Sequence, residues 1–172
     1  YERYCDAWKE NMLERIEKRV RPDLVVLGSA TKSLYRVNRN GATLSREASQ
    51  PYLVRGMVRL IRRLEATGAK VVVMRDQSTA PFTPSDCVAR NIHHLRRCAF
   101  VPASRRERAF ELTAARRTGI KAIDPQPMFC SRRLCPAVIG DAIVNKDNYH
   151  LTATYSRTLA RWMSGQLPAF GD

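Results

Sequence analysis

The sequence predicts an α/β fold in which a parallel sheet lies between helices, and three observations support this. Short apolar segments that suit strands buried on both faces occur at 24–27, 71–74 and 120–123. Segments with helical periodicity separate them. Each predicted strand leads into a loop of small or polar residues, the place where an open α/β sheet binds ligands. Such alternation favours right-handed crossovers and helices on both faces of one sheet.

The first helix is predicted over residues 4–20. Trp8, Met12, Ile16 and Val20 recur every four residues along it and should form its buried face. The second helix is expected to begin near 49 and to end at 68, after a polar loop over 31–48. Its expected buried residues are Leu53, Met57, Leu60, Ile61 and Leu64.

The C-terminal half contains shorter elements. A helix is predicted over 85–97, and a capping-box pattern at 104–107 should open another helix that ends near 118. An extended segment is expected over 138–144. The last helix follows His150, with apolar residues spaced by four: Leu151, Tyr155, Leu159 and Met163.

A carboxylate and an imidazole stand three residues apart just before that last helix. Asp147 lies in the loop and His150 at the start of the helical pattern. A carboxylate close to a histidine fixes the tautomer of the ring and stabilises the imidazolium, as in a hydrolytic triad. The two residues therefore suggest a general base and its orienting acid. The alternative is a capping carboxylate beside a surface histidine.

Gly28 and Ser29 follow the first predicted strand directly. Ser29 is a candidate nucleophile, and the backbone here is a candidate oxyanion site. The alternative is a tight turn, because the sequence lacks the G-x-S-x-G elbow that exposes a nucleophilic serine.

Composition is typical of one folded domain covering residues 1–172. The chain is 44% hydrophobic and 27% charged, with no apolar run long enough to span a membrane and no signal-peptide core. Because it begins with Tyr, we expect a piece of a longer protein. The formal net charge of +14 would suit an acidic polymer or nucleic acid. The arginines are spread over all predicted helices, which equally suits solvated helix faces and makes nucleic acid the less favoured partner.

Four of the five cysteines are spaced so that small disulfide loops could form. Cys87 and Cys98 flank a short helix, and Cys130 and Cys135 enclose four residues. Disulfides would indicate an extracytoplasmic protein. Zinc is the alternative, with His93 and His94 as further ligands, but the spacings lack the C-x2-C pattern and no metal or cofactor is expected. Cys5 is left over.

Taken together, these motifs resemble the SGNH-hydrolase domain fused to the membrane-bound acyltransferase-3 family. The resemblance rests on Asp147-x-x-His150-Leu-Thr, on the Cys130 to Cys135-Pro loop, on the Pro-rich loop before Cys87, and on the segments 4–8 and 22–27. It covers nearly the whole chain. It implies a flavodoxin-like three-layer α/β/α sandwich, with His150 as general base and Asp147 as orienting acid.

The resemblance also implies a function. Such a domain would transfer an acyl group, usually acetyl, to a glycan of the bacterial cell envelope through an acyl-serine intermediate. A membrane-spanning acyltransferase domain in the same parent chain would supply the acyl donor and tether the domain outside the cytoplasm. Two alternatives stay open: a carbohydrate esterase that stands alone, and a non-catalytic basic module that binds an acidic polymer or nucleic acid.

The sequence departs from the family at the nucleophile. The family serine lies in a Gly-Asp-Ser motif after the first strand, and no such motif occurs here. We therefore expect the chain to start downstream of that segment, to lack the first strand and a partner for Cys5, and to be nearly inactive alone. The family asparagine is not clearly matched, and Asn38 and Asn40 are the nearest candidates.

Overall fold

The computed structural model describes residues 2–29, 36–102 and 110–169. The predicted parallel sheet is confirmed. Its strands β1 (Leu24–Gly28), β4 (Lys70–Met74) and β5 (Lys121–Ile123) lie in the order β1-β4-β5, and both pairings are parallel. The carboxyl ends of all three strands therefore meet at one edge of the sheet, where the connecting loops gather.

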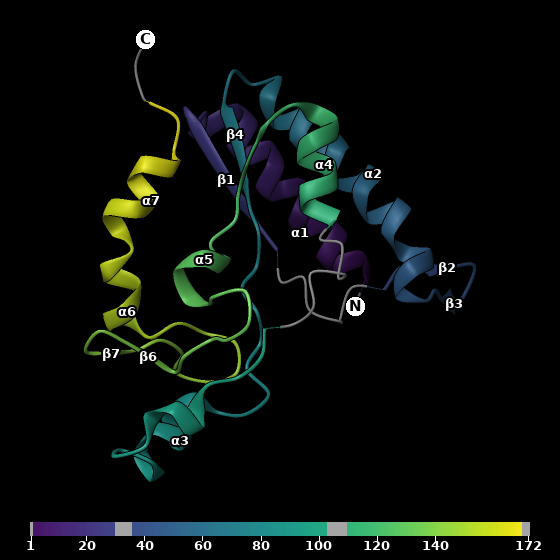
Figure 1. The fold of residues 1–172 in the computed structure, drawn as a ribbon. Helices are drawn as coiled ribbons and strands as arrows, with labels where there is room; N and C mark the ends of the chain where they lie inside the picture. The colour runs from purple at the N-terminus through teal and green to yellow at the C-terminus, as the bar shows by residue number, and fades with distance from the viewer. Residues whose placement is uncertain (1, 30–35, 103–109, 170–172) are drawn as a thin grey trace.

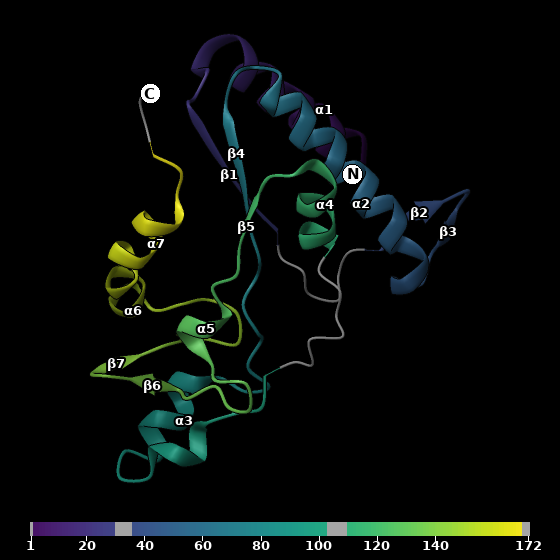
Figure 2. The same ribbon diagram turned by 45° about the horizontal axis from the view of Figure 1, so that its top comes forward.

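Helices cover both faces of this sheet, as predicted. One face carries α1 (Glu2–Arg15), α2 (Arg46–Glu65) and α4 (Phe110–Thr118), as Figures 1 and 2 show. The other face carries α6 (Ala153–Thr158) and α7 (Ala160–Gln166). Lys70 and Lys121 of the sheet donate to the backbone carbonyls of Ala169 and Gln166, which ties the C-terminal segment to the second face.

Alternation along the strands determines which side chains reach the first helical layer. Val71 and Val73 of β4 are buried there, and Val25 and Leu27 of β1 pack against the same cluster. The helices complete this sheet core with Leu13, Ile61, Leu64, Ala114 and Ala115. Burial of this apolar cluster is the main stabilising term for the N-terminal half.

Helix α2 begins earlier than the sequence predicted. Ser45 is its N-cap and accepts a hydrogen bond from the backbone N–H of Ala48 at 3.1 Å. Pro51 consequently lies inside the helix and not in its first turn. After the helix, the chain turns into β4 through Gly68, whose φ of +90° is the left-handed region that favours glycine.

The predicted buried face of the first helix is wrong at three of its four positions. Trp8, Met12 and Val20 are exposed, at 66%, 38% and 56%, whereas Ile16 packs against the sheet core as predicted. The buried Leu13 was not among the predicted residues. Residues Ile16–Val20 form a π-helical turn, η1, whose wider winding rotates Val20 out of the expected register.

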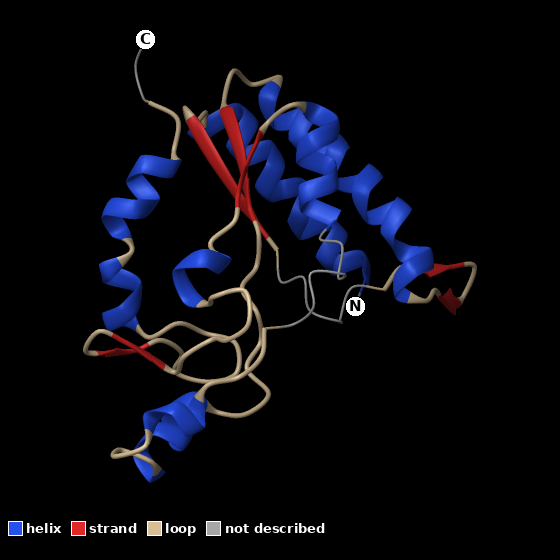
Figure 3. Ribbon diagram, in the orientation of Figure 1, coloured by secondary structure: helices blue, strands red, loops and turns tan. Residues whose placement is uncertain are grey.

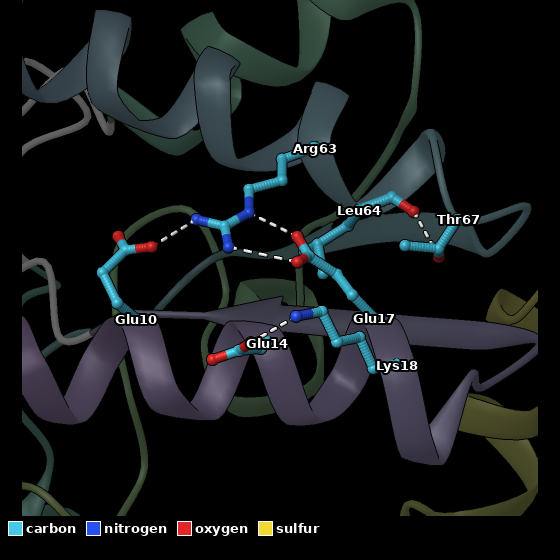
Figure 4. Close-up of polar contacts among 7 residues, drawn as sticks. All are labelled: Glu10, Glu14, Glu17, Lys18, Arg63, Leu64 and Thr67. Carbon is cyan, nitrogen blue, oxygen red and sulfur yellow. Dashed lines mark hydrogen bonds and ion pairs between the residues drawn. The ribbon is translucent and has the colours of Figure 1, made fainter.

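An arginine of α2 fixes how α1 lies against it. Figure 4 shows Arg63 reaching between Glu10 of α1 and Glu17 of η1. Its Nη1 donates to Glu10 at 2.6 Å and its Nη2 to Glu17 at 3.1 Å. These charge-assisted bonds raise the pKa of Arg63. The contact joins α1 and η1 to α2, while Leu13, and not Trp8, packs in the sheet core.

The C-terminal half departs from prediction in two places. The helix expected over 85–97 is divided into α3 (Pro84–Arg90) and the 3-10 turn η2 (Leu95–Cys98). Asn91 causes the break, because its side-chain amide donates to the carbonyl of Cys87 at 2.9 Å. The segment expected to be extended over 138–144 is a hairpin of β6 (Val138–Ile139) and β7 (Ala142–Ile143).

Two smaller elements complete the description. The loop expected over 31–48 contains a hairpin of β2 (Asn38–Arg39) and β3 (Ala42–Thr43), and α5 (Gln126–Phe129) follows β5. The predicted capping box at 104–107 lies outside the described residues. Within the described ranges, no helix is both long enough and apolar enough to cross a bilayer.

Candidate active site

The loop that holds Asp147 and His150 is fixed at both ends. Lys146 N–H donates to the carbonyl of His150 at 2.9 Å, which closes the loop on itself. On the C-terminal side, Thr152 N–H donates to Val144 at 2.9 Å, and the Thr152 hydroxyl caps α6 by accepting from Tyr155 N–H at 3.1 Å. The pair therefore sits on a short loop between β7 and α6, drawn tan in Figure 3.

Asp147 and His150 are in direct contact, as the sequence suggested. The ring Nδ1 of His150 lies 2.9 Å from Oδ2 of Asp147 and 3.0 Å from Oδ1. A proton on Nδ1 is therefore held by the carboxylate. In the neutral ring this leaves Nε2 unprotonated and able to accept a proton. The His150 side chain is 72% exposed while that of Asp147 is 33% exposed, so the imidazole faces solvent and the carboxylate is more covered.

The carboxylate of Asp147 also organises the backbone. Its Oδ1 accepts the N–H groups of Tyr149 and His150, each at 2.8 Å. The bond to the His150 ring and these two backbone donors lower the pKa of Asp147 from 3.8 to about 2. Asp147 therefore stays ionised across the range in which an imidazole works as a base.

The segment that follows β4 supports this loop. Asn148 and Ala80 exchange two bonds: Ala80 N–H donates to the Asn148 carbonyl at 3.1 Å, and the Asn148 amide donates to the Ala80 carbonyl at 3.0 Å. Gln77 donates to the Tyr149 carbonyl at 2.9 Å, and Ser85 to the Lys146 carbonyl at 2.6 Å. Because these residues continue from β4, the Asp147 and His150 pair lies at the carboxyl edge of the sheet.

Both expected disulfides are present: Cys87 is bonded to Cys98, and Cys130 is bonded to Cys135. Phe100 and Cys135 pair through two backbone hydrogen bonds of 3.0 and 2.8 Å, which link the two disulfide loops. Because these four thiols are oxidised, they cannot act as zinc ligands. Cys5 is free and exposed, in agreement with the expectation that it has no partner among the other four cysteines.

Other candidate residues lie in different surroundings. Asn38 accepts from Thr43 at 2.8 Å within the β2–β3 hairpin, which Figures 1 and 2 place at the far side of the molecule from α6. The structure therefore does not bring Asn38 and Asn40 to His150. His93 and His94 are exposed between α3 and η2.

Ser29 has a partner that sequence reasoning missed. It lies directly after β1, and its hydroxyl bonds to Oε1 of Glu111, the second residue of α4. Glu111 is fully buried, with a relative exposure of 0%. A signal exists in the sequence, because Glu111 stands three and four residues before Ala114 and Ala115 and thus on the apolar stripe of its helix. Gly28 beside it is exposed at the end of β1.

Comparison with known proteins identifies the family. The family described as "SGNH domain (fused to AT3 domains)" matches residues 1–164. Among solved structures, the periplasmic domain of a lipopolysaccharide acetyltransferase from Salmonella ser. Paratyphi A superposes with a TM-score of 0.64 at 14% sequence identity. The match covers 91% of this chain and 60% of that one, so the chain spans less than two thirds of its structural neighbour. No curated protein matches the chain.

The sequence resemblance and the α/β architecture therefore agree with both findings. The chain belongs to the family of SGNH domains that are fused to AT3 domains.

Proposed function

We propose that this chain is the extracytoplasmic SGNH domain of a membrane O-acyltransferase that transfers an acyl group, acetyl in the simplest case, to a cell-envelope glycan or a related acceptor. The observation that carries the proposal is the contact between His150 Nδ1 and the Asp147 carboxylate at 2.9 Å. Family membership and the acetyltransferase neighbour support the reaction class. The two disulfides support a location outside the cytoplasm.

In the proposed mechanism, a serine attacks the acyl donor while His150 Nε2 takes its proton. The tetrahedral intermediate expels the leaving group, which receives that proton from His150, and an acyl-serine remains. His150 then takes the proton of an acceptor hydroxyl as this attacks the acyl-serine. The serine leaves and regains the proton, so that His150 ends neutral. Asp147 keeps the ring oriented and stabilises the imidazolium at each step.

We assign the nucleophilic serine to a Gly-Asp-Ser segment of the parent protein outside these 172 residues, since the motif is absent here. The acyl donor would be delivered by the AT3 membrane domain of the same parent chain, which would also tether this domain. No metal or cofactor is required by the steps above. If water replaces the glycan hydroxyl in the second step, the same residues perform carbohydrate esterase chemistry.

The test uses the parent protein with 4-nitrophenyl acetate as donor and a glycan as acceptor. His150→Ala should abolish formation of acylated glycan, while His93→Ala, an exposed histidine of the same chain, should not change it. Unchanged acylation in His150→Ala would overturn the proposal. Release of free acetate without acylated glycan would identify the esterase alternative.

A second candidate, a basic module that binds an acidic polymer, is favoured by one surface feature. Arg39 and Arg55 both stack on the Tyr52 ring, 5.4 and 4.5 Å from its centroid. Among the described residues, neither guanidinium forms an ion pair with a carboxylate, so two like charges are held together and open to an anion. Log affinity for an acidic polysaccharide that falls steeply with log salt would support this candidate, and binding that does not respond to salt would exclude it.

A further inference from the structure

Glu111 is a buried carboxyl group at the carboxyl edge of the sheet, outside the Asp147 and His150 pair. It lies in the first turn of α4, and its neighbours on the helix stripe, Ala114 and Ala115, pack into the sheet core. One carboxyl oxygen bonds to the Ser29 hydroxyl. The other, Oε2, is buried and has no hydrogen-bond partner among the described residues. Buried polar atoms without partners are rare, so this one requires an explanation.

Protonation of Glu111 supplies part of that explanation. Burial raises the pKa of Glu111, and the negative charge of Asp76 raises it further. The bond to Ser29, its own backbone N–H and the charge of Arg75 act in the opposite direction but do not outweigh burial. A neutral carboxylic acid costs far less to bury than a carboxylate and carries one O–H donor.

We propose that Glu111 is a positioning residue that acts through Ser29. The neutral carboxyl of Glu111 donates a hydrogen bond to Ser29 Oγ. The Ser29 hydroxyl therefore directs its own hydrogen toward the oxyanion of the acyl-transfer intermediate. This inference rests on the proposed function. A serine that accepts from Glu111 has its hydrogen available for a substrate oxygen, whereas a serine that donates to an ionised Glu111 does not. The hydrogen bond strengthens as charge develops on the oxygen and breaks when the carbonyl reforms, so no proton is transferred.

The segment that follows β4 interacts both with this pair and with the loop of His150. Asp76, whose charge acts on Glu111, follows β4 and accepts from the Gln77 N–H at 2.9 Å. Gln77 in turn donates to the carbonyl of Tyr149 at 2.9 Å, next to His150. Ser29, at the end of β1, and His150 are therefore both supported from the carboxyl edge of one sheet.

The rival role for the same two residues is a nucleophile with its base. In that case ionised Glu111 would take the proton of Ser29, and Ser29 would become acylated. Glu111→Gln separates the two roles, because the amide can still donate to Ser29 but cannot accept its proton. Glu111→Leu removes both abilities, and Ser29→Ala removes the hydroxyl.

The experiment measures kcat and KM of the parent protein with 4-nitrophenyl acetate for these three variants and for the double variant Glu111→Leu/Ser29→Ala. We expect Glu111→Gln to keep kcat within about twofold, and Glu111→Leu and Ser29→Ala each to lower kcat roughly tenfold or more with little change in KM. The double variant should be no slower than either single one. Glu65→Gln, at the exposed end of α2, is the matched control and should behave as wild type.

Three kinetic results would overturn the proposal: wild-type kcat in Glu111→Leu, multiplicative losses in the double variant, or a Glu111→Gln variant as slow as Glu111→Leu. Acylated Ser29 in a mass spectrum would establish the rival role. If Glu111→Leu does not fold, Glu111→Gln and Ser29→Ala still decide the matter. His150→Ala distinguishes failure of the proposed function from failure of the role of Glu111. If His150→Ala retains activity, the proposed function is rejected. If His150→Ala loses activity while the Glu111 and Ser29 variants keep it, only the role of Glu111 is rejected.

A second measurement, of the protonation state of Glu111, does not depend on enzymatic activity. Carbon-13 NMR of the glutamate carboxyls in this chain should show that Glu111 is still protonated above pH 4.5, the ordinary pKa of a glutamate carboxyl. Titration of Glu111 at or below that ordinary value would contradict the neutral donor, whatever the kinetics show.

Discussion

At the scale of single residues, the carboxylate of Asp147 has two structural roles. Its oxygens hold the ring of His150 and also two backbone N–H groups of the same loop. The loop geometry and the ring orientation are therefore coupled, and a change at Asp147 affects both. An isosteric amide separates them, because its oxygen can still accept from the backbone while its charge is lost.

Asp147→Asn should therefore leave the fold intact but lower acyl transfer by the parent protein roughly 100- to 10,000-fold, because the imidazolium loses its counter-charge and the ring its tautomer. The measurement is kcat with 4-nitrophenyl acetate, with a circular dichroism spectrum as the check on folding. Asp141→Asn, an exposed carboxylate in the β6–β7 turn, is the control and should retain full activity. Equal rates in the two variants would argue against the orienting role.

The lowered pKa of Asp147 also predicts how stability depends on pH. Because its pKa falls from 3.8 to about 2 on folding, Asp147 stabilises the native state above pH 3.8, and this contribution is lost as the pH falls toward 2. The urea midpoints of wild type and Asp147→Asn should differ at pH 5 and converge near pH 2. A difference that persists undiminished at pH 2 would be inconsistent with this linkage.

The two polar pairs differ in how far the sequence could reveal them. Asp147 and His150 are three residues apart, so the local pattern suggested the pair, and the family resemblance favoured it over a capping carboxylate. Ser29 and Glu111 are 82 residues apart and meet only because α4 packs beside the end of β1. The position of Glu111 on the apolar stripe of its helix indicates that it is buried, but no local pattern indicates that its partner is Ser29.

At the scale of elements, α2 is the helix on which the sheet core depends most. Ile61 and Leu64 are fully buried on it, one turn apart, and contact the residues of β4. The sequence predicted these positions because α2 is long and its apolar spacing is regular. For α1 and η1 the same reasoning was right only at Ile16, since the π-helical turn changes the winding after Arg15 and Leu13 takes the buried position.

Ile61→Ala should lower the free energy of unfolding by about 2–5 kcal/mol, because it removes buried methyl groups and leaves a cavity. Arg62→Ala, the exposed neighbour on the same helix, should change it by less than about 0.5 kcal/mol. Urea denaturation of this chain measures both. Similar losses in the two variants would show that α2 does not cover the sheet as described.

At the scale of the whole molecule, the described residues form three packed apolar clusters. The sheet core joins the N-terminal helices to β1 and β4, and a second core, the rim core, includes Val144 and Tyr155 on either side of the loop that holds Asp147 and His150. The Cys130–Cys135 disulfide lies in the rim core, and the Cys87–Cys98 disulfide lies in a smaller third cluster with Val88 and Ala137; regular structure is short around both. The rim core consists of Ala80, Phe100, Phe129, Cys130, Cys135, Ala142, Val144, Tyr155 and Leu159.

Loss of a disulfide should therefore loosen one half of the molecule more than the other. In Cys87→Ala/Cys98→Ala, loop-closure entropy predicts a loss of about 3 kcal/mol, and amide exchange should accelerate in residues 80–102 while residues 54–73 stay protected. Hydrogen exchange with mass spectrometry resolves the two regions. Cys5→Ala is the control, because that thiol is free and exposed. Uniform acceleration over the whole chain would indicate one cooperative unit instead.

The parallel sheet and its two helical layers could be predicted because they follow from alternation along the whole chain. The β6–β7 hairpin was missed although the sequence contains a local signal for it, because Gly140 and Asp141 separate two short apolar segments and Gly140 adopts the positive φ of a two-residue turn. Strands of only two residues are too short to show alternation, so the segment was interpreted as one extended piece.

The order β1-β4-β5 leaves one border of the described sheet at β1. Such a border presents backbone donors and acceptors that can continue the ladder with another strand. A strand that joins it in parallel must finish at the same edge as its neighbours, and thus beside Gly28 and Ser29. Because a strand rises about 3.3 Å per residue, its pairing register with β1 would determine which of its residues lies beside Gly28 and Ser29. The same register of an incoming strand would therefore decide which of its residues lies beside the Ser29 and Glu111 pair.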